Sequence, residues 1–401
     1  MLVVSQIIKK LSHKDRSLSF ICLSFTFQSA FALITPIYVL YLQSEGLTPQ
    51  QITAVSSVFM ISLFLLEVPT GLIADVFGRK ISVVVGWALR SVSFFVYYWA
   101  DSLPVFFIAE FVGAIGAACV SGSFAAWLRE KTDYQGYLKT VSQTEVVIRI
   151  APIFLSLISG YLAFNFGYNN LFLIGGVILM FTTFVGIFFM DPDQISERRN
   201  PELKGAEQFL SVIKDAKKVL LSSEILRMFL LAEFLVGLSL ESIKMFWSIK
   251  FVQELGSEKY IGLIMGLSSI MLVVGSWLAG RIGKNKKQMK LNLMLTAFFS
   301  AISIFIASIS RVFVLTIFSY LTHILINKIL RILRRVFVQE HLPTSVRSSL
   351  TSLASMVQTC GSVLGLSLAG FLVAQYSITV AWIVSSLVLL ISGVVYGWTK
   401  S

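Results

Sequence analysis

Long apolar segments recur from one end of the chain to the other, and each is long enough to cross a lipid bilayer as a helix. An α-helix needs about 20 residues to cross the roughly 30 Å of hydrocarbon in a membrane. The approximate limits of the predicted spans are 18–43, 52–74, 81–100, 104–128, 140–163, 169–190, 227–252, 261–281, 290–309, 312–333, 348–373 and 377–398. The sequence therefore predicts an all-α membrane protein with twelve transmembrane helices.

The small share of charged residues supports this fold class. Only 13% of the residues are Asp, Glu, Lys or Arg, whereas soluble globular proteins have about 25%. The net charge of +12 would indicate nucleic acid binding in a soluble protein. Here the basic residues gather in alternate loops, so membrane topology accounts for the charge and we expect no nucleic acid partner.

The basic residues also predict the orientation in the membrane, because cytoplasmic loops carry an excess of Lys and Arg. The predicted cytoplasmic loops contain Arg79, Lys80, Arg129, Lys131, Lys139, Lys214, Lys217, Lys218, Lys284, Lys286 and Lys287. We therefore expect a multi-pass protein of the cytoplasmic membrane with both termini in the cytoplasm.

A polar segment, 191–226, divides the chain into two parts of six predicted helices each. The first part covers 1–190 and the second covers 227–401. Within the polar segment, apolar residues recur at helical spacing over 209–219. This pattern predicts either an amphipathic helix at the membrane surface or a solvated linker helix.

The two parts also carry an internal repeat. Gly71 and Gly280 stand at equivalent places, 280 − 71 = 209 residues apart, and Gly160 and Gly370 are 370 − 160 = 210 residues apart. A repeat of this length predicts two pseudo-symmetric six-helix bundles.

A short charged turn between the second and third predicted helices has a distinctive spacing, formed by Gly71, Asp75, Gly78, Arg79 and Lys80. The two glycines permit a tight reversal and a close approach of helices. The acid and the bases lie where the chain leaves lipid. This pattern resembles the G-x-x-x-D-x-x-G-R-K loop of the major facilitator superfamily of membrane transporters, and a generic basic cytoplasmic turn is the alternative.

The resemblance implies the fold of that superfamily, with twelve helices in two six-helix bundles, and a conformational role for this loop. In the family the loop lies in the cytoplasm and latches the two halves of the transporter. The resemblance implies that Asp75 holds one conformational state. From their positions at the inner ends of their helices, we expect Arg129 to be the partner of Asp75 and Glu67 to lock the loop. Val76 stands where the family often has an arginine, so one electrostatic contact of the family loop is missing.

The sequence contains no pattern typical of an enzyme. The three histidines, His13, His323 and His341, are scattered, and the three cysteines lie inside apolar runs without disulfide or metal spacing. No nucleophile motif and no phosphate-binding Walker motif is present, which argues against an ATP-driven pump. We therefore expect no catalytic activity, no cofactor and no metal site.

Charged residues inside the predicted spans are the informative ones, because each costs about 2.5–3.5 kcal/mol at a helix centre and needs a partner or a watery cavity. One face of the predicted helix 227–252 contains Glu233, Gly237, Glu241, Lys244 and Ser248 at steps of three and four. One face of the predicted helix 312–333 contains His323, Asn327, Arg331 and Arg334, with Lys328 and Arg335 beside it.

The resemblance implies that helices 1, 4, 7 and 10 line a central cavity, so both stripes would face the same water. The predicted cavity comprises Gln28, Glu110, Glu241, Lys244, Trp247, His323, Asn327, Lys328 and Arg331. We expect Glu241, Lys244 and His323 to share one hydrated network, because an isolated charge at mid-membrane is expensive. His323 is also the side chain whose ordinary pKa lies near neutral pH.

Several of these residues have a plainer interpretation. Arg334 and Arg335 are interpreted as the positive-inside end of their helix. Glu145 and Arg149, spaced i and i+4, are interpreted as a structural pair. Arg90 either extends to the membrane surface or pairs with the second helix. Trp127 and Trp247 either line the cavity or pack between helices. Gly361, Gly365 and Gly370 are interpreted as a face of small residues along which helices pack closely.

The best interpretation is a secondary transporter that exports small amphiphilic molecules, with the proton gradient as its energy source. The mixture of acids and bases in the predicted cavity favours zwitterionic or anionic cargo. Two patterns of proton-coupled family members are missing, since no arginine occupies the level of Glu110 and Ala151-Pro152 replaces a Gly-Pro pair. The alternatives are a metabolite importer or uniporter, and a receptor or scaffold without transport. We expect a monomer whose partners are a small-molecule substrate and membrane lipid.

Overall fold

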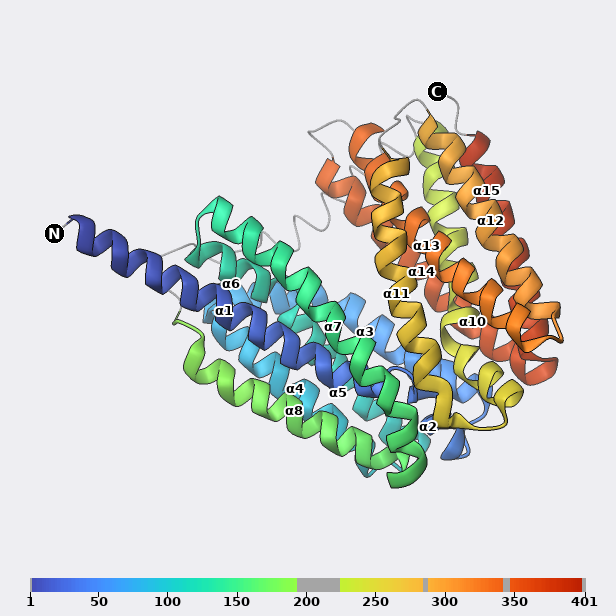
Figure 1. The fold of residues 1–401 in the computed structure, drawn as a ribbon, viewed down its shortest axis with the longest axis horizontal. Helices are drawn as coiled ribbons and strands as arrows, with labels where there is room; N and C mark the ends of the chain where they lie inside the picture. The colour runs from blue at the N-terminus through green and yellow to red at the C-terminus, as the bar shows by residue number, and fades with distance from the viewer. Residues whose placement is uncertain (1, 193–223, 284–287, 342–346, 399–401) are drawn as a thin grey trace. The chain divides into compact units, whose positions relative to one another are not determined.

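The computed structural model describes residues 2–192, 224–283, 288–341 and 347–398 (Figure 1). These residues form helices joined by short turns, and no β-strand occurs among them. The helix predicted within 209–219 lies outside the described residues, as does most of the linker predicted at 191–226. The domain boundaries predicted at 190 and 227 flank that segment and stay predictions.

The helices follow one another with few residues between them. The first part of the chain forms α1 (Leu2–Ile34), α2 (Tyr38–Ser44), α3 (Pro49–Phe77), α4 (Arg79–Tyr98), α5 (Leu103–Val120), α6 (Ser123–Lys131), α7 (Tyr134–Phe166) and α8 (Tyr168–Phe189). The second part forms α10 (Glu224–Leu255), the 3₁₀ turn η1 (Glu258–Tyr260), α11 (Ile261–Ile282), α12 (Met289–Ile309), α13 (Phe313–His341), α14 (Arg347–Gln375) and α15 (Ile378–Trp398).

Eleven segments among the described residues are long and apolar enough to cross a membrane. The helix α10 is not one of them, although its 32 residues would suffice in length. Charged side chains interrupt its apolar sequence, among them Glu233, Glu241, Lys244 and Lys250. Together with α10 the eleven segments match the twelve predicted spans, which confirms the predicted all-α membrane protein.

Two predicted spans are each divided into two helices. The span predicted at 18–43 breaks between α1 and α2, where Pro36 supplies no backbone N–H and its ring would clash with the preceding turn of a continuous helix. The span predicted at 104–128 breaks between α5 and α6, where Gly122 has a φ of +74°. Glycine adopts this left-handed conformation without strain.

The chain forms two compact units, and neither is one continuous half of the sequence. The first unit comprises the described parts of Met1–Tyr41, Val58–Gly205 and Glu258–Gly266. The second unit comprises the described parts of Leu42–Ser57, Ala206–Ser257 and Leu267–Ser401. The start of α3 therefore belongs to the second unit, and η1 with the start of α11 belongs to the first.

In the first unit, α4 packs against α5 and α8, and α1 packs against α7 and α8 (Figure 1). Glycines permit the close contact between α4 and α5, because a Cβ on Gly86 would lie 2.7 Å from the carbonyl oxygen of Gly116. An apolar cluster around Trp87 and Trp127 fills the space between α1, α4, α6 and the end of α8.

In the second unit, α10 packs against α14 and α15, and α12 packs against α13 and α15. The predicted small-residue face of α14 is confirmed. A Cβ on Gly361 or Gly365 would overlap with the backbone of α10 at Phe234 or Leu238, and a Cβ on Gly370 would overlap with Thr53 of α3. Backbones approach closely at such faces, which strengthens packing between membrane helices.

Candidate functional site

The charged turn joins α3 to α4 and is held by ion pairs. Gly78 connects the helices with a φ of +101°. Arg79, the first residue of α4, places Nη2 at 3.2 Å from Asp75 Oδ1 and Nε at 2.8 Å from Glu130 Oε1 on α6. Lys80 Nζ donates to the carbonyl oxygen of Ile187 at 2.7 Å, near the end of α8. The turn therefore binds two other elements of the first unit through its basic residues.

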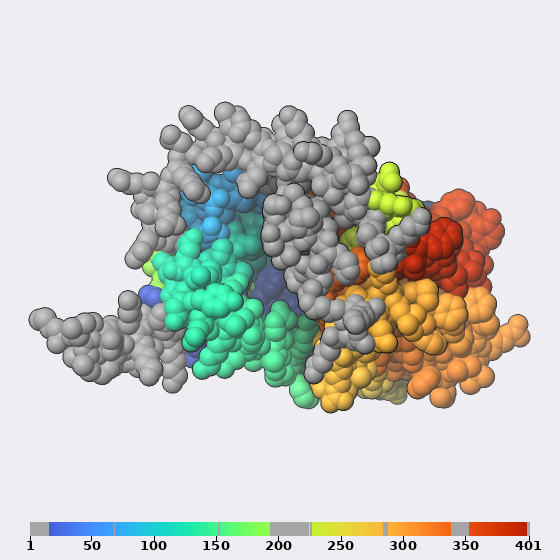
Figure 2. Space-filling model, turned by 90° about the horizontal axis from the view of Figure 1, so that it is seen from above, coloured from blue at the N-terminus to red at the C-terminus, as the bar shows by residue number. Residues whose placement is uncertain are grey.

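The prediction that Arg129 is the partner of Asp75 is wrong. Arg129 Nη1 donates to the carbonyl oxygen of Thr132 at 3.3 Å, and its guanidinium lies 5.9 Å from the ring centres of both Tyr134 and Tyr137. Figure 2 views the molecule from a side on which this teal and green region, α6 and the start of α7, is exposed. The neighbouring residue Glu130 makes the contact with the turn instead, because it lies within reach of Arg79.

The other residues predicted around the turn have weaker contacts. Glu67 is exposed and accepts a hydrogen bond of 3.4 Å from Ser121 Oγ. A Cβ on Gly71 would meet no atom within 4 Å, so space does not require a glycine there. Val76, which stands in place of an arginine, is exposed.

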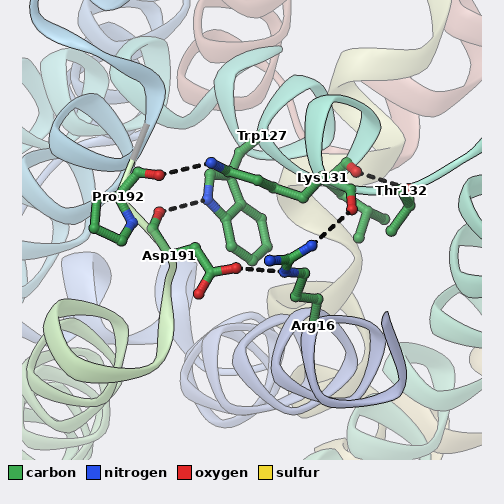
Figure 3. A network of polar contacts seen from close by, with 7 residues as sticks. Arg16, Trp127, Lys131, Thr132, Asp191 and Pro192 are labelled. Carbon is green, nitrogen blue, oxygen red and sulfur yellow. Dashed lines mark hydrogen bonds and ion pairs between the residues drawn. The ribbon is translucent and has the colours of Figure 1, made fainter. Parts of the chain in front are cut away.

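A polar network joins the middle of α1, the last turns of α6 and the residues after α8 (Figure 3). Arg16 on α1 donates from Nε to the Asp191 carboxylate and from Nη1 to the carbonyl oxygen of Lys131 at 3.2 Å. Trp127 Nε1 donates to the Asp191 carbonyl oxygen at 3.1 Å, and Lys131 Nζ donates to the Pro192 carbonyl oxygen at 2.6 Å. These contacts fix the residues after α8 against α1 and α6.

Glu110 on α5 is a buried carboxyl group with two tyrosine partners. Glu110 is 9% exposed. Tyr38 of α2 donates to Glu110 Oε1 at 2.5 Å, Tyr97 of α4 donates to the same oxygen, and the two hydroxyl oxygens are 3.2 Å apart. Both tyrosines use Oε1, so Oε2 can carry a proton without breaking either bond.

Arg90 lies on α4 near this carboxyl group, but it forms no ion pair within the described part of the chain. Its Nη1 donates to the carbonyl oxygen of Gly113 at 3.2 Å, and its Nε is buried without a hydrogen-bond partner. The guanidinium carbon lies 4.5 Å from the ring centre of Phe31 and 5.2 Å from that of Phe59. Arg90 therefore contacts the second membrane helix, α3, through the ring of Phe59.

A second buried carboxyl group, Glu233 of α10, lies in the second unit and is ion-paired. Arg334 Nε of α13 lies 3.2 Å from Glu233 Oε1, and Tyr396 of α15 donates to the same oxygen at 3.0 Å. Arg334 is 7% exposed and also donates to Gln358 Oε1 of α14 at 3.2 Å. Arg334 is therefore a buried ion-pair partner, a role that its interpretation as the positive-inside end of the helix did not include, and Arg335 is exposed.

The predicted network of Glu241, Lys244 and His323 forms only in part. Lys244 Nζ lies 2.6 Å from Glu241 Oε1, and Ser362 Oγ of α14 donates to that oxygen at 2.9 Å. His323 does not join them. Its Nδ1 lies 2.9 Å from Ser300 Oγ of α12, and the histidine is 1% exposed.

The stripe on α10 also differs from its predicted setting. Gly237 faces α14, because a Cβ there would overlap with the backbone at Gln358 and Ser362. Glu233 is buried among three helices of the second unit, as described above. The prediction that the whole stripe faces water is therefore wrong, because α10 uses this face to pack against its neighbours.

The remaining predicted cavity residues are dispersed. Trp247 is buried and stacks on Tyr320, with ring centres 6.2 Å apart, which is a packing role. Asn327 is buried, Gln28 and Lys328 are half-buried, and Arg331 is exposed. Within the described residues no three His, Cys, Asp or Glu side chains lie close enough together to hold a metal ion.

Glu145 and Arg149 on α7 lie as their spacing predicts. Arg149 Nη2 is 3.2 Å from Glu145 Oε2, and both side chains are exposed by more than a third. A pair of this kind contributes little to stability, because water screens it.

Sequence reasoning missed the tyrosines of the Glu110 site and the pairing of Glu233 with Arg334. The second was accessible in principle, because two opposite charges inside predicted spans each need a partner. No signal in the sequence pointed to Tyr38 or Tyr97, since aromatic residues are common throughout this chain.

The sequence of this chain is similar to those of known membrane transporters. The sequence model of the Major Facilitator Superfamily matches residues 20–327. The chain is 25% identical over 369 residues to an uncharacterized MFS-type transporter, YxaM, of Bacillus subtilis (strain 168), covering 92% of each chain. It is 22% identical over 380 residues to Multidrug resistance protein 2 of the same organism, covering 91% of this chain and 90% of that protein.

The solved structures support the same fold. The crystal structure of the nucleoside transporter NupG superimposes with a TM-score of 0.82, covering 96% of this chain and 98% of that chain. Its sequence identity is 15%, so this similarity concerns the fold alone.

Proposed function

The chain belongs to the Major Facilitator Superfamily of membrane transporters, and from this premise we propose that it exports small zwitterionic or anionic amphiphiles in exchange for protons. The relative named as a multidrug resistance protein supports export. The excess of basic residues in alternate loops supports the cytoplasmic membrane as its location, with both termini in the cytoplasm. The proton gradient is the energy source, and no cofactor takes part.

The observation that carries this proposal is the setting of Glu110. Its carboxyl group is buried in a membrane helix, and its hydrogen-bond partners are two neutral tyrosine hydroxyls. A charge inside the membrane costs about 2.5–3.5 kcal/mol, so the protonated and ionised forms favour different surroundings. A carboxyl group that is not fixed by an ion pair can change its protonation state during a transport cycle.

Proton binding and cargo binding are linked if each favours a different conformation. In the proposed cycle, cargo binding from the cytoplasm releases the proton from Glu110, and a proton from outside restores the neutral carboxyl group after export. Tyr38 and Tyr97 hold the carboxyl group in place in both forms, because Oε1 accepts their hydrogen bonds while Oε2 gains or loses the proton.

The charged turn supports the conformational part of this cycle. Arg79 binds Asp75 and Glu130 together, and Lys80 binds the end of α8. These exposed ion pairs are individually weak, on the order of 1 kcal/mol or less, so they can form and break as the protein changes state. We assign Asp75, Arg79 and Lys80 to conformational control, with Glu130 as a second ion-pair partner of Arg79.

The proposal can be tested in everted membrane vesicles that are energised by respiration and loaded with a pH-sensitive dye such as acridine orange. We expect at least one of two amphiphiles, octyl sulfobetaine and octanesulfonate, to release protons from vesicles that contain the wild-type protein. The Glu110→Gln variant should lose at least nine-tenths of this proton flux, because an amide cannot carry the proton.

Glu145→Gln is the matched control, because Glu145 is an exposed acid in the same unit. Its proton flux should equal that of the wild-type protein. Equal proton flux in Glu110→Gln and the wild type would contradict the assigned role of Glu110, and no flux with any amphiphile in the wild type would contradict proton-coupled export.

A further inference from the structure

The guanidinium of Arg90 has no carboxylate within ion-pair distance in the described part of the chain. The guanidinium is always charged at neutral pH. In the described part of the chain it donates one hydrogen bond, to the Gly113 carbonyl oxygen, and its buried Nε has no partner; Nε and Nη1 of Arg334 also have no hydrogen-bond partner, but that guanidinium has Glu233 beside it. An unpaired buried donor is destabilising by about 1–3 kcal/mol, so this arrangement calls for an explanation.

We propose that Arg90 and Glu110 form a two-pole binding site for a zwitterionic ligand, in which Arg90 binds the acidic group and the ionised Glu110 binds the cationic group. This inference rests on the proposed function and narrows its cargo to zwitterions. Arg90 donates to the carbonyl oxygen of Gly113, about one turn after Glu110 on α5, yet the two side chains do not form an ion pair in the described part of the chain. A ligand that carries both charges satisfies both poles at once.

Aromatic rings take the place of a counter-ion around Arg90. Phe31 of α1, Phe59 of α3 and Phe94 of α4 have ring centres 4.5, 5.2 and 5.9 Å from the guanidinium carbon. Cation–π contacts stabilise the charge without neutralising it. The guanidinium is therefore kept inside the unit as a cation that a carboxylate, sulfonate or phosphate group can bind in a planar, bidentate manner.

Two glycines of α5 make room for Arg90. A Cβ on Gly113 would lie 2.9 Å from Arg90 Nη1, and a Cβ on Gly116 would lie 3.0 Å from Arg90 Cγ. These contacts are tighter than an ordinary van der Waals contact. A Cβ would also lie 2.8 Å from Ser93 Oγ or 2.6 Å from the Gly86 carbonyl oxygen, so a larger residue would displace the arginine together with its neighbours on α4. The sequence thus supplies small residues one and two turns after Glu110, on the side of α5 that meets Arg90.

The site explains how a zwitterion is exchanged for a proton. The titratable and charged groups facing Glu110 are Tyr38 from α2 and Tyr97 and Arg90 from α4. The cationic group of the ligand and a proton compete for the same carboxylate, so one displaces the other. The anionic group of the ligand binds Arg90 and adds affinity without displacing a proton. A purely anionic ligand has no cationic group that could compete with the proton for the Glu110 carboxylate.

The test uses full-length protein in lipid nanodiscs and three ligands with the same eight-carbon chain. These are octyl sulfobetaine, octanesulfonate and octyltrimethylammonium, and calorimetry in buffers of different ionisation enthalpy measures affinity and proton release. We expect the wild type to bind the sulfobetaine more tightly than either singly charged ligand and to release a proton on binding. Empty nanodiscs correct for partitioning into lipid.

Arg90→Gln should weaken sulfobetaine binding by about 10- to 100-fold, the range that corresponds to losing hydrogen bonds to a charged group. Arg90→Lys keeps the positive charge but lacks the planar guanidinium that donates two parallel hydrogen bonds, so it should give an intermediate affinity. Gly113→Ala retains the arginine but displaces it, so it should also weaken binding even if Arg90→Gln folds poorly. Glu110→Gln should abolish proton release.

Three results would overturn the two-pole site. They are equal sulfobetaine affinity in Gly113→Ala, Arg90→Lys and the wild type, no preference of the wild type for the sulfobetaine, and binding without proton release. If these occur while Glu110→Gln still abolishes proton flux in vesicles, the inference fails and the proposed function stands. If Glu110→Gln also leaves that flux unchanged, the proposed role of Glu110 fails as well.

Discussion

Glu110 in the first unit and Glu233 in the second are both buried carboxyl groups on membrane helices, with residue exposures of 9% and 4%. Each accepts a hydrogen bond from tyrosine. They differ in one partner, because Glu233 lies 3.2 Å from a guanidinium nitrogen of Arg334, whereas Arg90 stays out of ion-pair contact with Glu110. The comparison teaches that burial alone does not identify a proton carrier.

The partner decides what each carboxyl group can do. Arg334 holds the charge of Glu233 in place, so protonation of Glu233 would leave a buried guanidinium without its counter-ion. Glu110 has hydroxyl partners that accept either protonation state, since a hydroxyl both donates and accepts hydrogen bonds. We therefore interpret Glu233 as a structural residue that joins α10, α13 and α15, and Glu110 as a functional one.

The largest expected effect tests the structural half of this comparison. Arg334→Gln removes one partner of a buried ion pair and leaves Glu233 uncompensated, so we expect the free energy of unfolding to fall by about 3–5 kcal/mol. Thermal unfolding in detergent, followed by tryptophan fluorescence, measures the loss.

The double variant Glu233→Gln with Arg334→Gln serves as the control, because it removes both charges. It should be more stable than Arg334→Gln alone. If the double variant is the less stable of the two, the buried charge of Glu233 is not the cause of the loss.

Glu110→Gln tests the functional half and should affect stability less. The amide oxygen can still accept hydrogen bonds from Tyr38 and Tyr97, so the free energy of unfolding should change by less than about 1.5 kcal/mol. Proton flux should nevertheless be lost. A stability loss as large as that of Arg334→Gln would remove the distinction between the two carboxyl groups.

Glu241→Gln sharpens the comparison with a pair of intermediate exposure. Lys244 is 46% exposed in its side chain, so water can solvate its charge after the substitution, and Ser362 can still donate to the amide. We expect a loss of about 1 kcal/mol or less. The pH dependence of transport should match that of the wild type in both Glu241→Gln and His323→Ala, since both residues belong to the second unit and Glu110 to the first. A shifted pH profile in either variant would return it to the proton pathway.

The smallest effect is expected at the exposed pair on α7. Glu145→Gln should change the free energy of unfolding by only about 0.3–0.5 kcal/mol, the range for an i,i+4 pair on a helix. The difference in unfolding free energy between this variant and the wild type should become smaller at high salt, because salt screens the exposed pair. A loss above 1 kcal/mol would mean that exposure is a poor guide to pair strength here.

The helices could be predicted from the sequence because span length depends on local apolar content. The same pattern could not reveal the breaks at Pro36 and Gly122 within long apolar runs, although proline and glycine mark them once the helices are known. It predicted the span of α10 but could not show the partners of its charges, which lie elsewhere in the chain.

The site could be predicted only in part, because spacing along one helix does not say which helix faces it. Glu110 was predicted from its charge inside a span, and the Glu241–Lys244 contact from its spacing. Arg334 was assigned to a membrane surface because arginines are common at helix ends, but it is buried against α10. His323 was expected beside Glu241, but its neighbour is Ser300 on α12.

The charges of α10 have a consequence for biosynthesis. A helix with this many charges is a poor substrate for insertion into the membrane on its own. Its buried acids are compensated by Arg334, Ser362 and Tyr396, on helices that the ribosome makes later. We therefore expect α10 to wait at the translocon until α13 to α15 emerge, so that a nascent chain ending before Phe313 would fail to retain α10 across the bilayer.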